Sequence, residues 1–244
     1  MKVIAIFKWY RNPQDALIGA SGNVEWPGVK MSASDDDPAV IEIAKSISGD
    51  NEIVALTIGD GDASWAAARG AASTLVITDA LYDVNSSVTG AALASAVRLY
   101  DDIDAVIIGD SSWDYGVVSA FVGQLGWPAI AAVTAAEVKE GRLYVTQKAG
   151  SVSQVLEVQT PAVLAAMATQ TEKNEPSMKQ VLMARKKPIK KITMADLNLP
   201  APSDAVNSLG TRFPDTPPAV LIDGGDPASA CEQLLAALHM EGVL

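Results

Sequence analysis

The chain has 244 residues, of which 49% are hydrophobic and 5% aromatic, and its formal net charge is −11. That length fits one domain with appendages or two small ones, and the small branched side chains suit a sheet covered by helices. The negative charge disfavours nucleic acid and anionic membrane surfaces as partners. A single cysteine, Cys231, excludes an internal disulfide and a zinc cluster of cysteines. The first apolar run, residues 3–7, is too short for a signal peptide or a membrane span, so we expect a cytoplasmic location without membrane insertion.

Short apolar runs alternate with segments of helical periodicity in the first half of the chain. Continuous apolar runs predict buried strands at residues 3–7, 53–58, 75–77 and 105–108. Asp37 suits the N-cap of a first helix and Pro38 its first position. Further helices are predicted at residues 63–72, 87–100 and 117–125. This order predicts an α/β fold whose parallel sheet is flanked by helices.

The pattern changes after Pro128. Runs at 143–146 and 152–158 predict an antiparallel pair after a turn at 137–141, and residues 161–168 predict one more buried strand. A hairpin is predicted at residues 19–27. Residues 198–218 contain five prolines and precede a helix at about 227–240, which predicts an arm that lies on another surface. We therefore divide the chain into an α/β domain, 1–197, and a C-terminal arm with its helix, 198–244.

Three loops are expected to meet at one edge of the sheet, where ligands of open parallel sheets bind. They are residues 7–9, 59–61 and 109–116. Glycine lets the backbone approach a ligand, and the helix starting near Gly116 offers backbone N–H groups to a phosphate. From spacing alone, simple turn and cap formation explains these residues equally well. Neither the dinucleotide fingerprint nor a phosphate-loop motif is present.

Other polar groups favour structural roles. The acidic run 35–37 could hold a hard cation, but a helix cap with solvated charges is the favoured interpretation. His239 has no nucleophile motif to serve, and Cys231 is expected in a core on an apolar helix face. We therefore expect no catalytic residue and no metal ligand. Five cations lie within seven positions and form either a solvated face or a patch for an acidic partner: Arg185, Lys186, Lys187, Lys190 and Lys191.

Several motifs together resemble the β subunit of electron transfer flavoproteins, in the form called the FixA family. Residues 2–8 look like its opening strand, residues 34–40 like its first helix start, and Gly126-Trp127-Pro128 like its turn. The most specific stretch runs from Asn174-Glu175-Pro176-Ser177 through residues 184–189. Residues 195–197 and the tail from 225 to the C-terminus are also similar, so the resemblance covers the whole chain.

The resemblance implies a Rossmann-type sheet, similar to that of adenine nucleotide alpha hydrolases, and an electron carrier without catalytic residues of its own. A partner α subunit would hold the main FAD and be wrapped by the C-terminal arm. Ordinary members of the family hold AMP in this subunit and bifurcating members a second FAD; we expect AMP here. The chain would accept electrons from a dehydrogenase and pass them to a downstream acceptor. The recognition loop, residues 172–187, would dock the dehydrogenase through Met178, Arg185, Lys186 and Lys187. The implied nucleotide-site residues are Ile6, Phe7, Lys8, Ile58, Gly59, Asp110, Asp114, Tyr115, Gly116, Val117, Val118 and Ser119.

The loop after the fourth strand departs from the family pattern, since it is shorter and lacks the family's glutamine. Val117 and Val118 offer no polar side chain, and two lost contacts of about 0.5–1.5 kcal/mol each predict nucleotide binding weakened about tenfold or more. A pocket filled by water or side chains is the alternative. A universal-stress-type regulatory protein would share the sheet but act as a homodimer, and a hydrolase would lack any nucleophile. The basic stretch and the arm favour the electron carrier.

Overall fold

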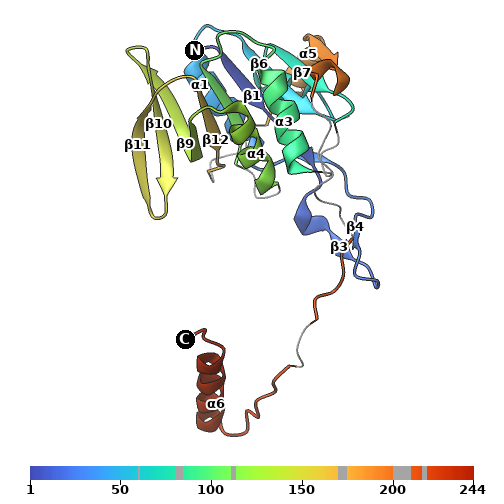
Figure 1. Cartoon of the computed structure of the whole chain (residues 1–244), viewed down its shortest axis with the longest axis vertical. Helices are drawn as coiled ribbons and strands as arrows, with labels where there is room; N and C mark the ends of the chain where they lie inside the picture. The colour runs from blue at the N-terminus through green and yellow to red at the C-terminus, as the bar shows by residue number, and fades with distance from the viewer. Residues whose placement is uncertain (60, 81–84, 111–113, 170–174, 200–209, 216–218) are drawn as a thin grey trace. The chain divides into compact units, whose positions relative to one another are not determined.

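The computed structural model describes residues 1–59, 61–80, 85–110, 114–169, 175–199, 210–215 and 219–244. Contacts divide the chain into two compact units. The larger unit contains residues 1–17 and 25–208, and the smaller contains residues 18–24 and 209–244. Figure 1 labels the elements of both.

A nine-stranded sheet forms the centre of the larger unit (Figure 1). Seven adjacent strands, from β9 to β13, are parallel, whereas β10 runs antiparallel to β9 and β11. The α/β fold predicted from the sequence is therefore confirmed. In spatial order the strands are β11 (Val152–Val158), β10 (Arg142–Ala149), β9 (Ala129–Lys139), β12 (Ala162–Ala166), β8 (Ala105–Gly109), β1 (Val3–Ile6), β6 (Ile53–Ile58), β7 (Ser73–Ile77) and β13 (Ile189–Ile192).

Helices cover both faces of this sheet. Helices α1 (Asp37–Ser48) and α2 (Trp65–Arg69) pack on the face that carries Val3 and Ala5 of β1. Helices α3 (Ser86–Val97) and α4 (Tyr115–Leu125) pack on the opposite face, which carries Ile4 and Ile6. Successive side chains of a strand point to opposite faces, so a strand covered on both must be apolar throughout. This requirement explains the continuous apolar run at the start of the chain.

The remaining elements belong to both units. They are β2 (Trp9–Tyr10), the 3-10 turn η1 (Pro13–Asp15), β3 (Leu17–Ile18), β4 (Val24–Glu25), β5 (Ser32–Ala33), α5 (Met178–Ala184), the 3-10 turn η2 (Ala195–Leu197) and α6 (Pro227–Met240). The predicted hairpin is formed by β3 and β4. None of the helices in the described ranges is long and apolar enough to cross a membrane.

Several elements differ from the sequence predictions in their bounds, as does α2, predicted at 63–72 and observed at Trp65–Arg69. Strand β9 continues through Lys139, so the turn expected at 137–141 shrinks to Glu140 and Gly141, both with positive φ. Strand β13, for which the sequence predicts no element, pairs with β7, and the side chains of its two lysines are exposed at this edge. Helix α1 begins at Asp37, so Asp36 takes the N-cap position.

The smaller unit joins the predicted hairpin to the start of the C-terminal arm. Thr211 Oγ1 donates a hydrogen bond to the Gly22 carbonyl at 2.9 Å and accepts one from the Val24 N–H at 3.2 Å. Gly22 has φ +81°, and a Cβ there would lie 2.7 Å from the Phe213 nitrogen. Only glycine therefore satisfies both the backbone angle and the space at this position.

The described residues leave the apolar face of helix α6 uncovered. None of its residues is buried, and Leu234 and Leu235 are each 50% exposed. Cys231 is also exposed, so the prediction that it packs in a core is wrong for the chain alone. The leucines on this face of α6 thus pack into no core formed by the described residues.

Gly22→Ala should loosen the contact between hairpin and arm. The positive φ costs about 1–2 kcal/mol with a side chain, and the overlap with backbone atoms adds to it. In hydrogen exchange, the Val24 amide should exchange at least about tenfold faster, since 1.4 kcal/mol is one decade. Gly28→Ala is the matched control, because Gly28 has φ +71° with nothing within 4 Å of its Cβ position. Equal Val24 exchange in both variants would contradict this interpretation.

Candidate functional site

The sheet has a topological switch point between β1 and β8. The chain moves from β1 to β6 and β7 on one side, and then to β8 and β12 on the other. The carboxyl ends of these strands form what we call the ligand edge, because ligands of open α/β sheets bind at such a point. Lys8 follows β1 there, and Gly109 and Asp110 end or follow β8.

Lys8 and Asp114 form a buried ion pair at the ligand edge. The Lys8 ammonium lies 2.7 Å from Asp114 Oδ2 and 2.9 Å from Oδ1, and Lys8 is only 3% exposed. Burial raises the pKa of Asp114, while the Lys8 charge opposes that rise. The structure therefore brings together two of the predicted site residues that lie 106 positions apart in the sequence.

Asp37 is a second buried carboxylate at this edge. Its Oδ2 accepts hydrogen bonds from the Ser34 N–H at 2.8 Å and the Lys8 N–H at 3.2 Å. Burial raises its pKa to about 7, against the lowering effect of Lys8 and of these two bonds. The solvated charge expected at this position is therefore wrong. Asp37 instead joins the end of β1 to the start of α1.

Asp36 and Asp110 also bind backbone groups. Asp36 accepts from the Ala168 N–H at 2.8 Å, and Asp110 accepts from the Ala132 N–H at 2.9 Å. Burial is the main cause that raises the pKa of Asp36, with Asp110 adding to it. These hydrogen bonds hold Ala168, which follows β12, and Ala132, which lies within β9, at the ligand edge. Asp35, by contrast, is exposed as expected.

Three buried polar atoms near this edge have no hydrogen-bond partner among the described residues: Asp37 Oδ1, Ser34 Oγ and Trp9 Nε1. A Cβ on Gly109 would lie 3.1 Å from Asp37 Oδ1 and 3.5 Å from Ser34 Oγ, so both face the end of β8. The Trp9 indole covers Gly61, where a Cβ would overlap it. Unpaired buried polar groups are costly, and these atoms suit a polar ligand or water.

The other predicted nucleotide-site residues divide by burial. The side chains of Ile6, Phe7, Ile58 and Val117 belong to the cores, so only their backbone is free to reach a ligand. Gly59 follows β6 with φ +79° and donates its N–H to the Ile77 carbonyl. Gly116 and Ser119 are exposed on the first turns of α4, with Val118 half-buried between them. Tyr115 begins α4, but its side chain lies outside the described residues.

The start of α4 suits an anion. The Asp114 side chain is turned to Lys8 and makes no capping hydrogen bond to the helix. Backbone N–H groups in a first helical turn lack partners within the helix and bind phosphates. Among the described residues, no group of three or more histidine, cysteine or carboxylate side chains is arranged to hold a metal ion.

The predicted recognition loop contains a helix. Met178 is the first residue of α5 and is 75% exposed. A capping box between Ser177 and Gln180 starts this helix, a signal that the sequence carried and that the loop prediction missed. Residues 170–174 of this segment lie outside the described ranges.

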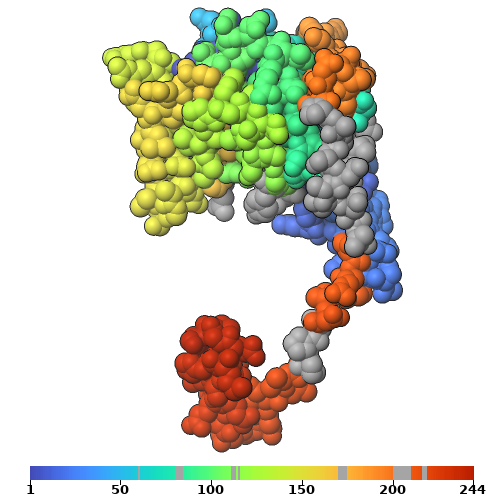
Figure 2. Space-filling view, in the orientation of Figure 1, coloured from blue at the N-terminus to red at the C-terminus, as the bar shows by residue number. Residues whose placement is uncertain are grey.

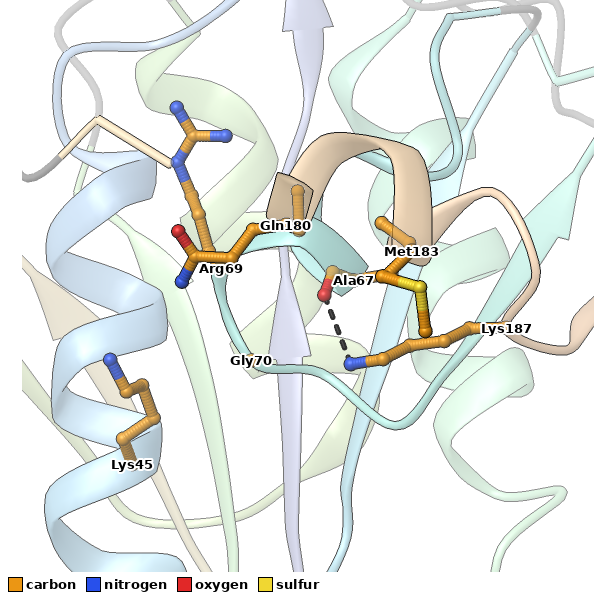
Figure 3. Close-up of a pocket in the computed structure, with 9 residues that line it drawn as sticks. Lys45, Ala67, Arg69, Gly70, Gln180, Met183 and Lys187 are labelled. Carbon is orange, nitrogen blue, oxygen red and sulfur yellow. Dashed lines mark hydrogen bonds between the residues drawn. The ribbon is translucent and has the colours of Figure 1, made fainter. Parts of the chain in front are cut away.

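The predicted docking cations take different roles. Lys187 donates to the carbonyls of Ala67 at 3.0 Å and Ala71 at 2.7 Å, so it fixes the segment to the end of α2 (Figure 3). Arg185 and Lys186 are exposed. A groove of about 300 Å³ separates α2 from α5, and it lies away from the ligand edge. It is lined by Lys45, Ala67, Ala68, Arg69, Gly70, Gln180, Met183, Ala184 and Lys187.

Asp37 should make stability depend on pH. Its folded pKa is about 7 against an ordinary 3.8, so its contribution is complete below about pH 4 and is lost as the pH rises towards 7. The loss is of the order of 4 kcal/mol at most, from about 1.4 kcal/mol per pKa unit. Asp37→Asn keeps an acceptor for both backbone N–H groups and should flatten most of this dependence in urea unfolding at pH 5 and pH 8.

Asp79→Asn is the control for this measurement, because exposed Asp79 also accepts a backbone N–H, from Met194 at 2.7 Å. In Asp79→Asn, the free energy of unfolding should differ between pH 5 and pH 8 by as much as it does in the wild type. A pH dependence that persists unchanged in Asp37→Asn would show that Asp37 is ionised in the folded protein.

Comparison with known proteins identifies the family of this chain. A family model described as the electron transfer flavoprotein domain matches residues 27–197, well over half of the chain. The electron transfer flavoprotein subunit beta of Syntrophomonas wolfei is 34% identical over 101 residues, which are 40% of this chain and 40% of that protein. The aligned part thus spans about two fifths of the relative. On the extent of the family match, the chain belongs to the electron transfer flavoprotein domain family.

Proposed function

We propose that this protein is the β-type subunit of an electron transfer flavoprotein, and that it carries electrons only together with an α-type subunit. The observation that supports this most is the family match over residues 27–197, which includes α1, α4 and α5. The relative's name as a subunit beta points to the same role. The match does not favour the universal-stress-type alternative. A cytoplasmic location stays a prediction from the sequence.

The proposed electron carrier needs no proton-transfer groups of its own. Its task is to complete the environment of a flavin held mainly by the partner and to bring a donor close. The lack of a dinucleotide fingerprint in the sequence supports FAD on the partner rather than on this chain. The carboxylates described at the ligand edge are bound to Lys8 or to backbone N–H groups, which suits a structural site.

We propose AMP as the occupant of the ligand edge. The first turn of α4, where Gly116 is exposed, supports a phosphate there, since its N–H groups bind an anion without any side chain. The unpaired atoms of Ser34, Asp37 and Trp9 support polar contacts with the rest of the nucleotide. Gly109 leaves space beside two of these atoms, which a larger residue would take.

The partner subunit is the occupant that we propose for the apolar face of α6. Residues 231, 234, 235 and 238 lie on one side of a helix with 3.6 residues per turn. Leu234 and Leu235 are half exposed, and fully burying such a side chain stabilises a complex by about 1.5–3 kcal/mol. The predicted domain of residues 198–244 would thus be the assembly arm.

Leu234→Asp should therefore prevent stable pairing with a co-expressed α-type subunit. A carboxylate in an apolar interface loses the leucine's burial and adds a desolvation penalty, so affinity should fall far more than about tenfold. The measurement is co-purification of the two chains on an affinity tag carried by the α-type subunit. Gln233→Asp introduces the same charge on the opposite side of α6 and should pair normally. Equal recovery of both variants would contradict an interface at this face.

We propose that α5 and residues 185–191, together the docking segment, meet the electron-donating dehydrogenase. Met178, Leu182 and Met183 are exposed on a short helix, and exposed cations follow them. Figure 2 shows this segment, in orange, at the surface of the larger unit, apart from the yellow strands β10 and β11. Apolar anchors supply affinity, whereas charges at a rim mainly raise the association rate.

Met178→Ala should slow electron transfer from the dehydrogenase without changing subunit assembly. Losing one buried apolar anchor of about 1.5–3 kcal/mol weakens docking roughly tenfold or more, which should appear as a higher dehydrogenase concentration at half-maximal rate. Val155→Ala removes an exposed apolar side chain from β11, at the opposite end of the sheet, and should leave this concentration unchanged. Wild-type kinetics for Met178→Ala at every donor concentration would exclude Met178 as an anchor.

A further inference from the structure

The positive charge of Lys8 is already used within the protein. Its ammonium lies within 2.9 Å of both Asp114 oxygens, and both side chains are nearly buried. Charges interact strongly where water is excluded. A ligand phosphate would have to displace Asp114 to reach this ammonium.

The surroundings of Lys8 are strongly acidic. Asp36, Asp37 and Asp114 each interact electrostatically with Lys8, and Asp110 acts on Asp36. Because the Lys8 ammonium is already paired with Asp114, it cannot also offset a phosphate, which brings close to two negative charges. Asp114 is also the N-cap residue of α4, so its negative charge lies beside the helix turn whose N–H groups would bind the phosphate and weakens that contact.

The unpaired groups at the same edge are of another kind. Ser34 Oγ is a hydroxyl, Trp9 Nε1 is an N–H donor, and Asp37 Oδ1 is a carboxyl oxygen. The raised pKa of Asp37 lets this oxygen carry a proton near neutral pH. Hydroxyl, amide and ring nitrogen groups of an uncharged ligand can pair with all three.

We propose that Asp114 is the specificity-determining residue of the ligand edge. By holding the Lys8 ammonium it makes the edge recognise the adenosine part of an adenine nucleotide, and the phosphate adds little to binding. This inference rests on the proposed nucleotide-binding function and deepens it. It would account for the weakened AMP binding that the sequence predicts, although Lys8 lies at the centre of the site.

Calorimetric titration of the full-length chain with adenosine and with AMP tests the proposal. In the wild type the two dissociation constants should agree within about threefold, because the phosphate gains less than one neutral hydrogen bond. Asp114→Asn keeps an acceptor of the same shape for Lys8 and removes the competing charge. It should tighten AMP binding by at least about tenfold and leave adenosine unchanged, since charge-assisted contacts are strong.

Two further variants separate the effect of the Asp114 charge from a folding defect of Asp114→Asn. The double variant Lys8→Met with Asp114→Asn removes both charges, and its ratio of AMP to adenosine affinity should match the wild type. Asp102→Asn breaks the exposed pair with Lys2, whose N–O distance is 3.5 Å, and should change neither affinity.

Two results would overturn the proposal. One is a wild-type chain that binds AMP more than about tenfold tighter than adenosine. A tenfold gain in affinity corresponds to about 1.4 kcal/mol, which is what one charge-assisted contact to the phosphate would contribute. The other is an Asp114→Asn chain that binds both ligands as the wild type does. Both results would leave the nucleotide site in place. Failure of adenosine and AMP to bind any variant would overturn the nucleotide site together with this inference, while the pairing through α6 would stand on its own test.

Discussion

The buried carboxylate of Asp37 is the contact on which the ligand edge depends. It accepts the backbone N–H groups of Lys8 and Ser34, so the end of β1 and the start of α1 are fixed by one side chain. With Lys8 fixed in this way, its ammonium meets Asp114 at the start of α4. The ligand edge is thus assembled from the end of β1, the start of α1 and the start of α4. Two contacts join these segments: the hydrogen bond from the Lys8 N–H to Asp37 and the ion pair of Lys8 with Asp114.

The same arrangement explains why glycine stands at the end of β8. Gly109 has Asp37 Oδ1 and Asp36 Cβ within 3.3 Å of the place a Cβ would take. A Cβ at this position would require Asp36 and Asp37 to shift by a few tenths of an ångström. The absence of a side chain at Gly109 therefore lets the end of β8 lie close to the carboxylates at the start of α1.

The sequence predicted the parts of the fold that follow from burial. Residues 3–7, 53–58 and 105–108 are continuously apolar because helices cover both faces of their strands. Strand β13 was missed because it lies at the sheet's end, where Lys190 and Lys191 remain solvated. A strand at the edge of a sheet can keep polar side chains in solvent, so it need not show the continuous apolar run that marks a strand buried on both faces.

The candidate site was only partly predictable, since its decisive contacts are tertiary. Lys8 and Asp114 were both named from the sequence, but nothing in either loop indicated that they neutralise each other. Asp37 was read as a cap with solvated neighbours, because the acidic N-terminus of a helix is commonly exposed. Its inward orientation depends on Ser34 three residues earlier and on β1. Lys187 likewise looked like a surface cation until α2 supplied two carbonyls for it.

The central claim is that this chain completes a flavoprotein whose main flavin sits on another subunit. Release of cofactors by acid from the purified pair with its α-type subunit, followed by chromatography, tests it most directly. The account predicts one FAD and one AMP per pair, and a purified single chain without flavin. Two FAD per pair, or a stoichiometric flavin on the chain alone, would contradict it.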